Sequence, residues 1–172
     1  VTVEDVVNSP MISDPLHRLD CCVISDGGGA LIVVSPEIAK TLNRPLVKVK
    51  GAGEAPKHQM GGRVDLTYSG AAWSGPAAFE EAGVKPSDIK YASIYDSFTI
   101  TVLLHLEDLG FCKKGEGGAF VEDGKLGPGG SLPTNTNGGG LSYCHPGMYG
   151  MFLLVEAARQ LRGEAGARQL DN

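Results

Sequence analysis

The residues that could do chemistry are concentrated in one glycine-rich segment, Asn135 to Gly150. Three consecutive glycines, residues 138–140, allow positive φ angles and close approach of the backbone to another group. His145 is followed by Pro146, a residue favoured in the first turn of a helix, and an apolar helical pattern begins at Met148. We therefore expect an imidazole and several backbone N–H groups at a helix N-terminus. This arrangement suits an oxyanion or thioester site.

Other side chains near this segment each allow two interpretations. Cys144 stands beside His145 and either packs within the turn or belongs to the site. Tyr143 projects from the same loop, and Tyr95 ends a β-rich stretch; each is either a reactive phenol or an aromatic that packs and bonds its O–H. Asp96 is either a catalytic carboxylate or the cap of the helix that follows it.

Strands and helices alternate around these residues. The predicted strands are residues 19–24, 30–34, 45–51 and 91–95. The predicted helices are residues 36–43, 75–82, a helix that follows Asp96–Ser97 and stops at Gly110, and residues 147–162. Irregular loops are expected at residues 51–68 and 111–133. The order βαβαβα indicates an α/β layered domain that ends on a helix, without a final strand.

Composition limits the function classes. The formal charge is −5 and no long basic run occurs, which argues against nucleic acid as a partner. No apolar stretch reaches the roughly 18 residues that a membrane span needs, and no signal peptide is visible. The 25 glycines, about twice the usual share, cluster in loops and so indicate tight turns instead of a fibre. Residues 25–29 lack the spacing of a nucleotide-phosphate loop.

The four cysteines form no Cys-x-x-Cys pair and have no zinc-like spacing with histidine. We therefore expect no metal site. Cys21 and Cys22 fall in a predicted strand and are interpreted as buried small side chains. Unpaired cysteines of this kind are typical of a reducing compartment, so the expected location is the cytoplasm.

Three segments, in this order, resemble the C-terminal half of a thiolase-superfamily protein. They are residues 19–30, residues 79–83 with 94–98, and residues 137–146. Within the superfamily the chain is most similar to the thiolase-like branch of sterol carrier and lipid-transfer proteins, which includes steroid side-chain aldolases. The resemblance covers nearly the whole chain. It implies a layered fold in which two similar halves pack around a shared core and act on acyl-CoA thioesters.

The resemblance also implies groups that these residues do not supply. In thiolases the acyl-accepting nucleophile is a cysteine of the N-terminal half, and a second cysteine acts as general base in a Cys-x-Gly turn between the last two strands. No Cys-x-Gly follows His145. We therefore expect residues 1–172 to form a single thiolase-like C-terminal domain, one half of a two-half enzyme, with the last strands missing.

Two family motifs can be placed on the chain residue by residue. The histidine of the Gly-His-Pro motif corresponds to His145, although Cys144 stands where the family has glycine. The Asn-Glu-Ala-Phe motif corresponds to residues 95–98, and Tyr95 replaces the asparagine that holds an oxyanion-hole water. The expected catalytic residues are His145, Tyr95, Tyr143 and Asp96. The expected substrate-binding residues are Asn137, Gly138, Gly139 and Cys144.

Tyr95 favours one of two reactions. Thiolytic acyl transfer needs an activated thiolate, whereas retro-aldol cleavage of a β-hydroxyacyl-CoA needs only an acid, a base and a stabilised enolate. The Tyr-Asp-Ser-Phe variant resembles thiolase-like aldolases that shorten steroid side chains, so we expect lyase chemistry in lipid or steroid degradation. Acyl transfer by a thiolase is the alternative. No cofactor is expected beyond CoA as part of the substrate.

The resemblance also implies partners. These are the missing N-terminal thiolase half, a second copy in a homodimer, and a small OB-fold protein that accompanies the aldolases. A different class of function remains open, in which the chain is a non-catalytic scaffold or lipid-binding module that pairs with another subunit.

Overall fold

The computed structural model describes residues 1–57 and 65–171. Most of its regular structure is helical. The helices are α1 (Val3–Val7), α2 (Pro36–Ala39), α3 (Ala71–Ala82), α4 (Thr99–Asp108), α5 (Gly117–Phe120), α6 (Gly139–Ser142) and α7 (Gly150–Arg162). Strands β1 (Met11–Ser13) and β2 (Leu16–His17) form an antiparallel hairpin. Short 3₁₀ turns occupy Arg18–Asp20, Pro86–Asp88, Glu122–Gly124 and Gly166–Arg168.

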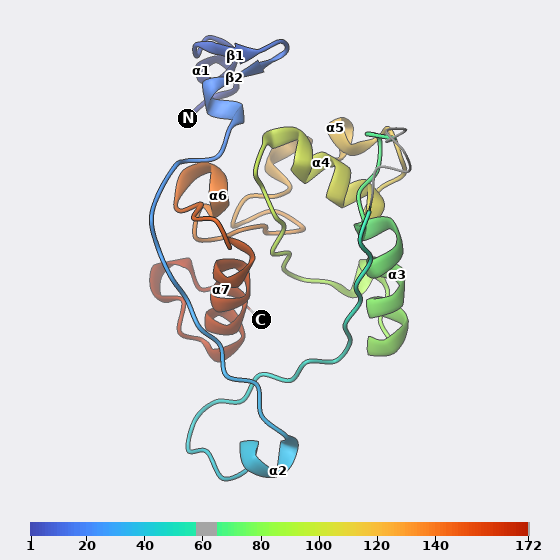
Figure 1. The fold of residues 1–172 in the computed structure, drawn as a ribbon, viewed down its shortest axis with the longest axis vertical. Coiled ribbons are helices and arrows are strands. Elements are labelled where there is room, and N and C mark those ends of the chain that lie inside the picture. The colour runs from blue at the N-terminus through green and yellow to red at the C-terminus, as the bar shows by residue number, and fades with distance from the viewer. Residues whose placement is uncertain (58–64, 172) are drawn as a thin grey trace.

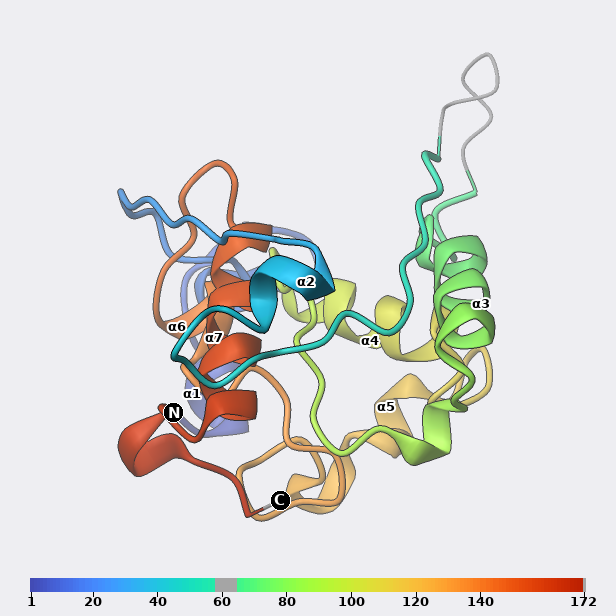
Figure 2. The same ribbon diagram turned by 90° about the horizontal axis from the view of Figure 1, so that it is seen from below.

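The helices gather on two sides of the segment that leads into α4. Helices α6 and α7 lie on one side, and α3 with α4 and α5 lie on the other (Figures 1 and 2). The β1–β2 hairpin with α1 stands at one end of the molecule, and α2 stands at the opposite end (Figure 1). Residues 22–34, the blue trace of Figure 1, join these two ends and run along α6 and α7.

The predicted strands do not form a sheet, and this part of the prediction was wrong. Residues 22–34, 45–57 and 89–95 follow irregular or extended paths, and among the described residues the β1–β2 hairpin is the only sheet. Two isolated bridges, Cys21 with Phe98 and Ala92 with Thr134, are the remaining β contacts of the described chain. A strand needs a neighbour for its N–H and C=O groups, and local β-propensity alone does not supply one.

Helix positions were predicted better than strand positions, with shifts at the ends. Helix α3 begins at Ala71, one turn before the predicted start, and contains Pro76. Helix α7 begins at Gly150, after the turn that holds Pro146. The sequence pattern gave no sign of α6, which falls inside the glycine segment. His145 therefore lies between two helices and not at the first turn of α7.

Helices α3 and α4 pack closely because a glycine faces a leucine. A Cβ on Gly75 would lie 2.7 Å from Cδ2 of Leu109, so a larger residue would force the leucine side chain to shift. The Asp108 carboxylate at the end of α4 accepts hydrogen bonds from the N–H and hydroxyl of Ser69, just before α3. Together these contacts fix the loop before α3 against the end of α4.

The main apolar core lies between the segment before α4, α4 itself and the loop at residues 111–132. Its fully buried members are Ala92, Ile94, Leu106 and Leu132. A second buried region lines one face of α7, where Tyr149, Leu153 and the polar Glu156 and Gln160 are buried. No helix among the described residues is long and apolar enough to cross a membrane.

Candidate active site

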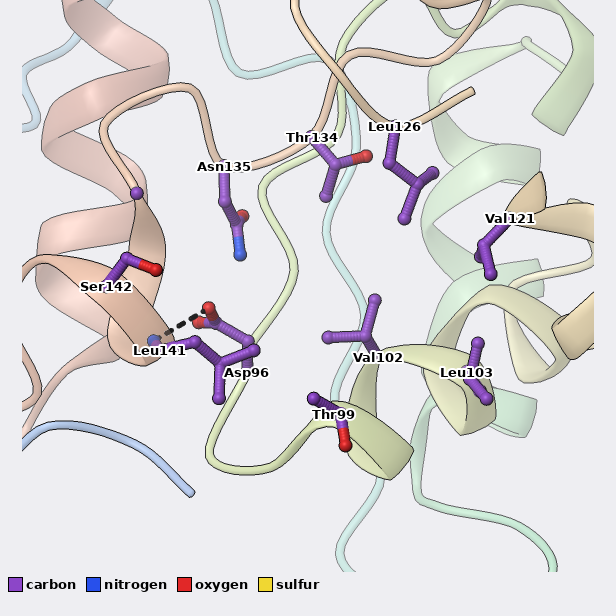
Figure 3. Close-up of a pocket in the computed structure, with 11 residues that line it drawn as sticks. Asp96, Thr99, Val102, Leu103, Val121, Leu126, Thr134, Asn135, Leu141 and Ser142 are labelled. Atoms are coloured by element: carbon purple, nitrogen blue, oxygen red, sulfur yellow. Dashed lines mark hydrogen bonds between the residues drawn. The ribbon is translucent and has the colours of Figure 1, made fainter. Parts of the chain in front are cut away.

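Asp96 is the buried centre of the candidate site. Its side chain is 3% exposed, and Oδ1 accepts the N–H of Gly140 at 2.8 Å while Oδ2 accepts the N–H of Leu141 at 3.1 Å. These are N–H groups of the first turn of α6, so Asp96 caps that helix from a distant part of the chain (Figure 3). The alternative that Asp96 caps the next helix was wrong, because Phe98 occupies the N-cap of α4 and makes no side-chain cap.

The glycines at 138–140 allow the backbone to approach the Asp96 carboxylate closely. Gly138 and Gly139 have φ angles of 100° and 60°, which side chains other than glycine rarely adopt. A Cβ on Gly139 would collide with Oδ2 of Asp96, and a Cβ on Gly140 would lie 2.6 Å from Cδ2 of His145. The backbone N–H groups that the sequence offered as oxyanion donors are therefore used internally. Gly140 and Leu141 donate to Asp96, and Gly139 donates to the side chain of Asn137.

Three aromatic rings meet beside Asp96. The imidazole of His145 stacks on the ring of Tyr149, with centroids 4.8 Å apart and planes 27° apart. Tyr95 stands edge-on to both, with its centroid 5.3 Å from that of His145 and 5.0 Å from that of Tyr149. The structure thus brings together His145, Tyr95 and Asp96, which the sequence predicted, and adds Tyr149.

His145 is held by a hydrogen bond of its backbone N–H, and its ring has a buried nitrogen without a partner in the part of the chain that the structure describes. Its N–H donates to Oγ of Ser25 at 2.8 Å, which ties the loop to the segment that follows the β hairpin. Its Nε2 is buried and has no hydrogen-bond partner among the described residues. A buried ring nitrogen without a partner costs free energy on folding, so its presence needs an explanation. A ligand that supplies the missing hydrogen bond is one such explanation.

Tyr149 is fixed as a hydrogen-bond donor. Its O–H donates to Oδ1 of Asp96 at 2.6 Å, and its side chain is 1% exposed. Burial, together with the hydrogen bond to Asp96 and the negative charge of that carboxylate, raises the pKa of Tyr149 above its ordinary value. The phenol is therefore protonated throughout the ordinary pH range and is committed to Asp96.

The remaining predicted site residues point elsewhere. Tyr143 is 58% exposed, and its ring does not pair with those of His145, Tyr95 or Tyr149. Cys144 is buried, accepts a weak hydrogen bond from Oγ of Ser25 at 3.5 Å, and faces the segment at Gly27. Asn137 accepts the N–H of Gly139, which stabilises the turn. Gly138 borders a cavity described below. The catalytic and binding roles of these four residues remain predictions, as do those of the other predicted site residues.

Sequence reasoning missed Tyr149 and Ser25. Tyr149 lies four residues after His145, a spacing that carries no special signal outside a helix. Ser25 belongs to a segment interpreted as strand and glycine bend, 120 positions before its partner. Asn135 was also missed, although its amide bonds both the N–H and the C=O of Ile94 and so aligns the segment that ends at Tyr95.

A buried polar network supports the loop from the side of α7. Glu156, 1% exposed, accepts hydrogen bonds from the Arg168 guanidinium at 3.1 and 3.2 Å and from the Thr136 hydroxyl at 2.8 Å. Gln160, one turn along α7, donates to Thr136 Oγ1 and to the backbone oxygen of Arg168. These hydrogen bonds fix Thr136, and with it the glycine-rich segment, to α7.

A cavity of about 410 Å³ opens on the other side of Asp96, between α4 and α6. Its wall is mostly apolar, with Val102, Leu103, Val121 and Leu126 facing Asp96 and Asn135 (Figure 3). Neither His145 nor Tyr95 lines it. The carboxylate of Asp96 thus separates this apolar cavity from the aromatic cluster.

Comparison with known proteins identifies the family of the chain. Residues 52–172, which include α3 to α7 and the whole glycine segment, match the family described as thiolase C-terminal domain-like. The chain belongs to this family. The fold class expected from the sequence is confirmed at the level of the family, although the segments predicted as strands lack sheet partners among the described residues.

Two relatives of this thiolase-like domain carry different activities in their names. A steroid side-chain-cleaving aldolase of Thermomonospora curvata is 43% identical over 169 residues, which cover 95% of this chain and 43% of the relative. An acetyl-CoA acetyltransferase of Methanothermobacter thermautotrophicus is 41% identical over 174 residues, covering 99% and 45%. The chain spans less than half the length of either relative.

The fold is shared with a solved structure of an Ltp2-ChsH2(DUF35) aldolase. The two superpose with a TM-score of 0.88 at 42% identity, covering 96% of this chain and 44% of that one. The thiolase-like domain therefore shares the fold of the matching part of that chain. The similar identities to an aldolase and to an acetyltransferase leave the choice of reaction to the residues of the site.

Proposed function

We propose that the protein containing this chain cleaves a carbon–carbon bond of an acyl-CoA thioester by retro-aldol chemistry. The proposed substrate is a β-hydroxyacyl-CoA that carries a steroid or lipid side chain. The observation that carries the proposal is the buried Nε2 of His145, which has no hydrogen-bond partner among the described residues and belongs to a ring that stands edge-on to Tyr95. Tyr95 stands where a thiolase would have asparagine, so the site offers a phenol in place of a bound water.

The retro-aldol reaction needs a base, an oxyanion donor and an acid. A base takes the proton of the β-hydroxyl, the Cα–Cβ bond breaks, and its electron pair forms the enolate of the shortened thioester. A proton on Nε2 of His145 would stabilise the enolate oxygen, as donors in oxyanion holes do. An acid then protonates Cα, which gives a shortened acyl-CoA and a carbonyl product. Tyr95 is our candidate for proton transfer, and Tyr143 is a second candidate from the exposed side of the loop.

Thiolase-type acyl transfer is the second candidate, and the identity to an acetyl-CoA acetyltransferase supports it. That reaction needs a thiolate that accepts the acyl group. Cys144, the cysteine nearest to His145, is buried against Ser25 and Gly27. The nucleophile of a thiolase would therefore have to come from another part of the protein.

Exposed apolar residues support the proposal that more protein covers this chain. Ile24 is fully exposed, and Ile32, Val33 and Val49 are largely exposed on the segments predicted as strands. Such surface is rarely left in water over a contiguous region. We propose that an N-terminal thiolase half covers it, and that a homodimer and a small OB-fold protein complete the assembly. We also infer a cytoplasmic location from the four free cysteines.

One experiment separates the candidates. The intact protein, purified with any partner that it retains, is given a β-hydroxyacyl-CoA alone and, separately, a 3-ketoacyl-CoA with free CoA. Mass spectrometry of the products is the readout. Cleavage of the first substrate supports the aldolase, and cleavage of only the second contradicts it in favour of the thiolase. If neither is cleaved, the scaffold or lipid-binding function is supported.

A further inference from the structure

We infer that Tyr149 is a positioning residue that orients the imidazole of His145 by linking it to Asp96. This inference deepens the proposed function and rests on it for the identity of the reaction. Tyr149 contacts both groups: its hydroxyl donates to Oδ1 of Asp96 at 2.6 Å, and its ring stacks on His145.

The hydroxyl of Tyr149 is anchored to a carboxylate that is itself held by hydrogen bonds. Asp96 is held by two backbone N–H groups of α6, and these in turn depend on a glycine turn that admits no side chain. The side chain of Tyr149 and the carboxylate of Asp96 are almost completely buried. Rotation of the phenol would leave Asp96 with one donor fewer in a buried place, which is costly.

The ring end of Tyr149 sets the plane of the imidazole. The two rings are nearly parallel, and Tyr95 closes the cluster edge-on at 86° to His145 and 65° to Tyr149. The backbone of His145 is fixed separately through Ser25. With the backbone and the ring plane both fixed, Nε2 stays in that plane even though it has no hydrogen-bond partner among the described residues.

The same contacts exclude Tyr149 from proton transfer. Its O–H is committed to a buried carboxylate, and burial beside that charge raises its pKa. Tyr149 therefore differs from Tyr95, the ring that stands edge-on to His145. The cluster divides the work between a tyrosine that orients and a tyrosine that is our candidate for transferring the proton.

Two substitutions in the intact protein test the inference. Tyr149→Phe keeps the stacked ring and removes the bond to Asp96, and Tyr149→Leu removes both. We expect kcat to fall by about 10- to 100-fold in Tyr149→Phe with little change in KM, and to fall further in Tyr149→Leu, because misplacement of a reacting group affects the chemical step. Tyr68→Phe is the matched control, since Tyr68 packs edge-on against Trp73, outside this cluster.

A second readout does not depend on the reaction. The Cε1–H proton signal of His145, assigned by its loss in His145→Gln, should move in Tyr149→Phe and stay in place in Tyr68→Phe. Unchanged kcat and an unmoved His145 signal in Tyr149→Phe would overturn the inference. If the wild-type protein cleaves neither substrate, the proposed reaction fails, and the His145 signal alone decides whether Tyr149 orients that ring.

Discussion

The carboxylate of Asp96 caps helix α6 through the N–H of Gly140, at 2.8 Å across 44 positions of the chain. A helix cap normally comes from the residue just before the helix, but here that residue is Gly138, which has no side chain. The cap therefore joins two parts of the candidate site. It holds the glycine segment against Asp96, which lies three positions before the start of α4.

Removal of this cap should destabilise the fold. In Asp96→Ala the buried N–H of Gly140, the part-buried N–H of Leu141 and the Tyr149 hydroxyl lose their acceptor, so we expect a loss of about 3 kcal/mol or more in unfolding free energy. Asp96→Asn should lose less, because the amide oxygen still accepts. Urea unfolding of the intact protein gives both values. Glu80→Gln, on an exposed part of α3, should leave stability unchanged; equal stability of Asp96→Ala and wild type would refute the capping role.

Gly139 should tolerate no side chain. Gly139→Ala combines a positive φ of 60° with a collision against Asp96, and the left-handed conformation alone costs about 1–2 kcal/mol in a residue with a Cβ. We expect a lower melting temperature and loss of activity. Gly150→Ala is the matched control: Gly150 opens α7 with nothing within 4 Å of a Cβ, so alanine should stabilise slightly. A melting temperature that falls equally in both variants would contradict this account.

His145 should be needed for catalysis more than for folding. If Nε2 donates to the developing enolate oxygen, His145→Ala should lower kcat by about 10²–10³-fold, the usual effect of removing one such donor. Because Nε2 has no partner among the described residues, the melting temperature should change much less than in Asp96→Ala. Steady-state kinetics and thermal unfolding test the two parts. His17→Gln, in β2, serves as the control, and full activity of His145→Ala would exclude the proposed role.

Stability should depend on pH through Glu156. Burial by itself would raise the pKa of this carboxyl, but the hydrogen bonds from Arg168 and Thr136 outweigh it and hold the pKa below its ordinary value of 4.5. Since the folded-state pKa lies below the unfolded one, the ionised form stabilises the fold above about pH 4.5. That stabilisation is lost as the pH falls through the folded-state pKa.

Glu156→Gln provides the measurement. At pH 7 the variant should melt below wild type, because a buried partner of Arg168 has lost its charge. Below pH 4.5 the two melting temperatures should converge as the pH falls through the folded-state pKa of Glu156, since the wild-type side chain then becomes neutral as well. Glu80→Gln should show no such convergence. A constant difference across this pH range would mean that Glu156 does not titrate as proposed.

The sequence by itself determined the family and the general location of the site. The glycines at 138–140, His145 and the motif at 95–98 are identified by residue type and spacing, and the positions of α3, α4 and α7 follow from local apolar periodicity and end signals. These properties depend on residues within a few turns of one another. Local patterns therefore suffice to predict them.

The tertiary structure decided what the site residues do. Asp96 caps α6 instead of its own helix, Tyr149 joins Asp96 to His145, and Ser25 holds the histidine backbone from 120 positions away. The segments predicted as strands remain without sheet partners among the described residues, because β-propensity cannot say which strand lies alongside. Each of these outcomes depends on groups distant in sequence that meet only when the chain folds, and no periodicity along the chain records such meetings.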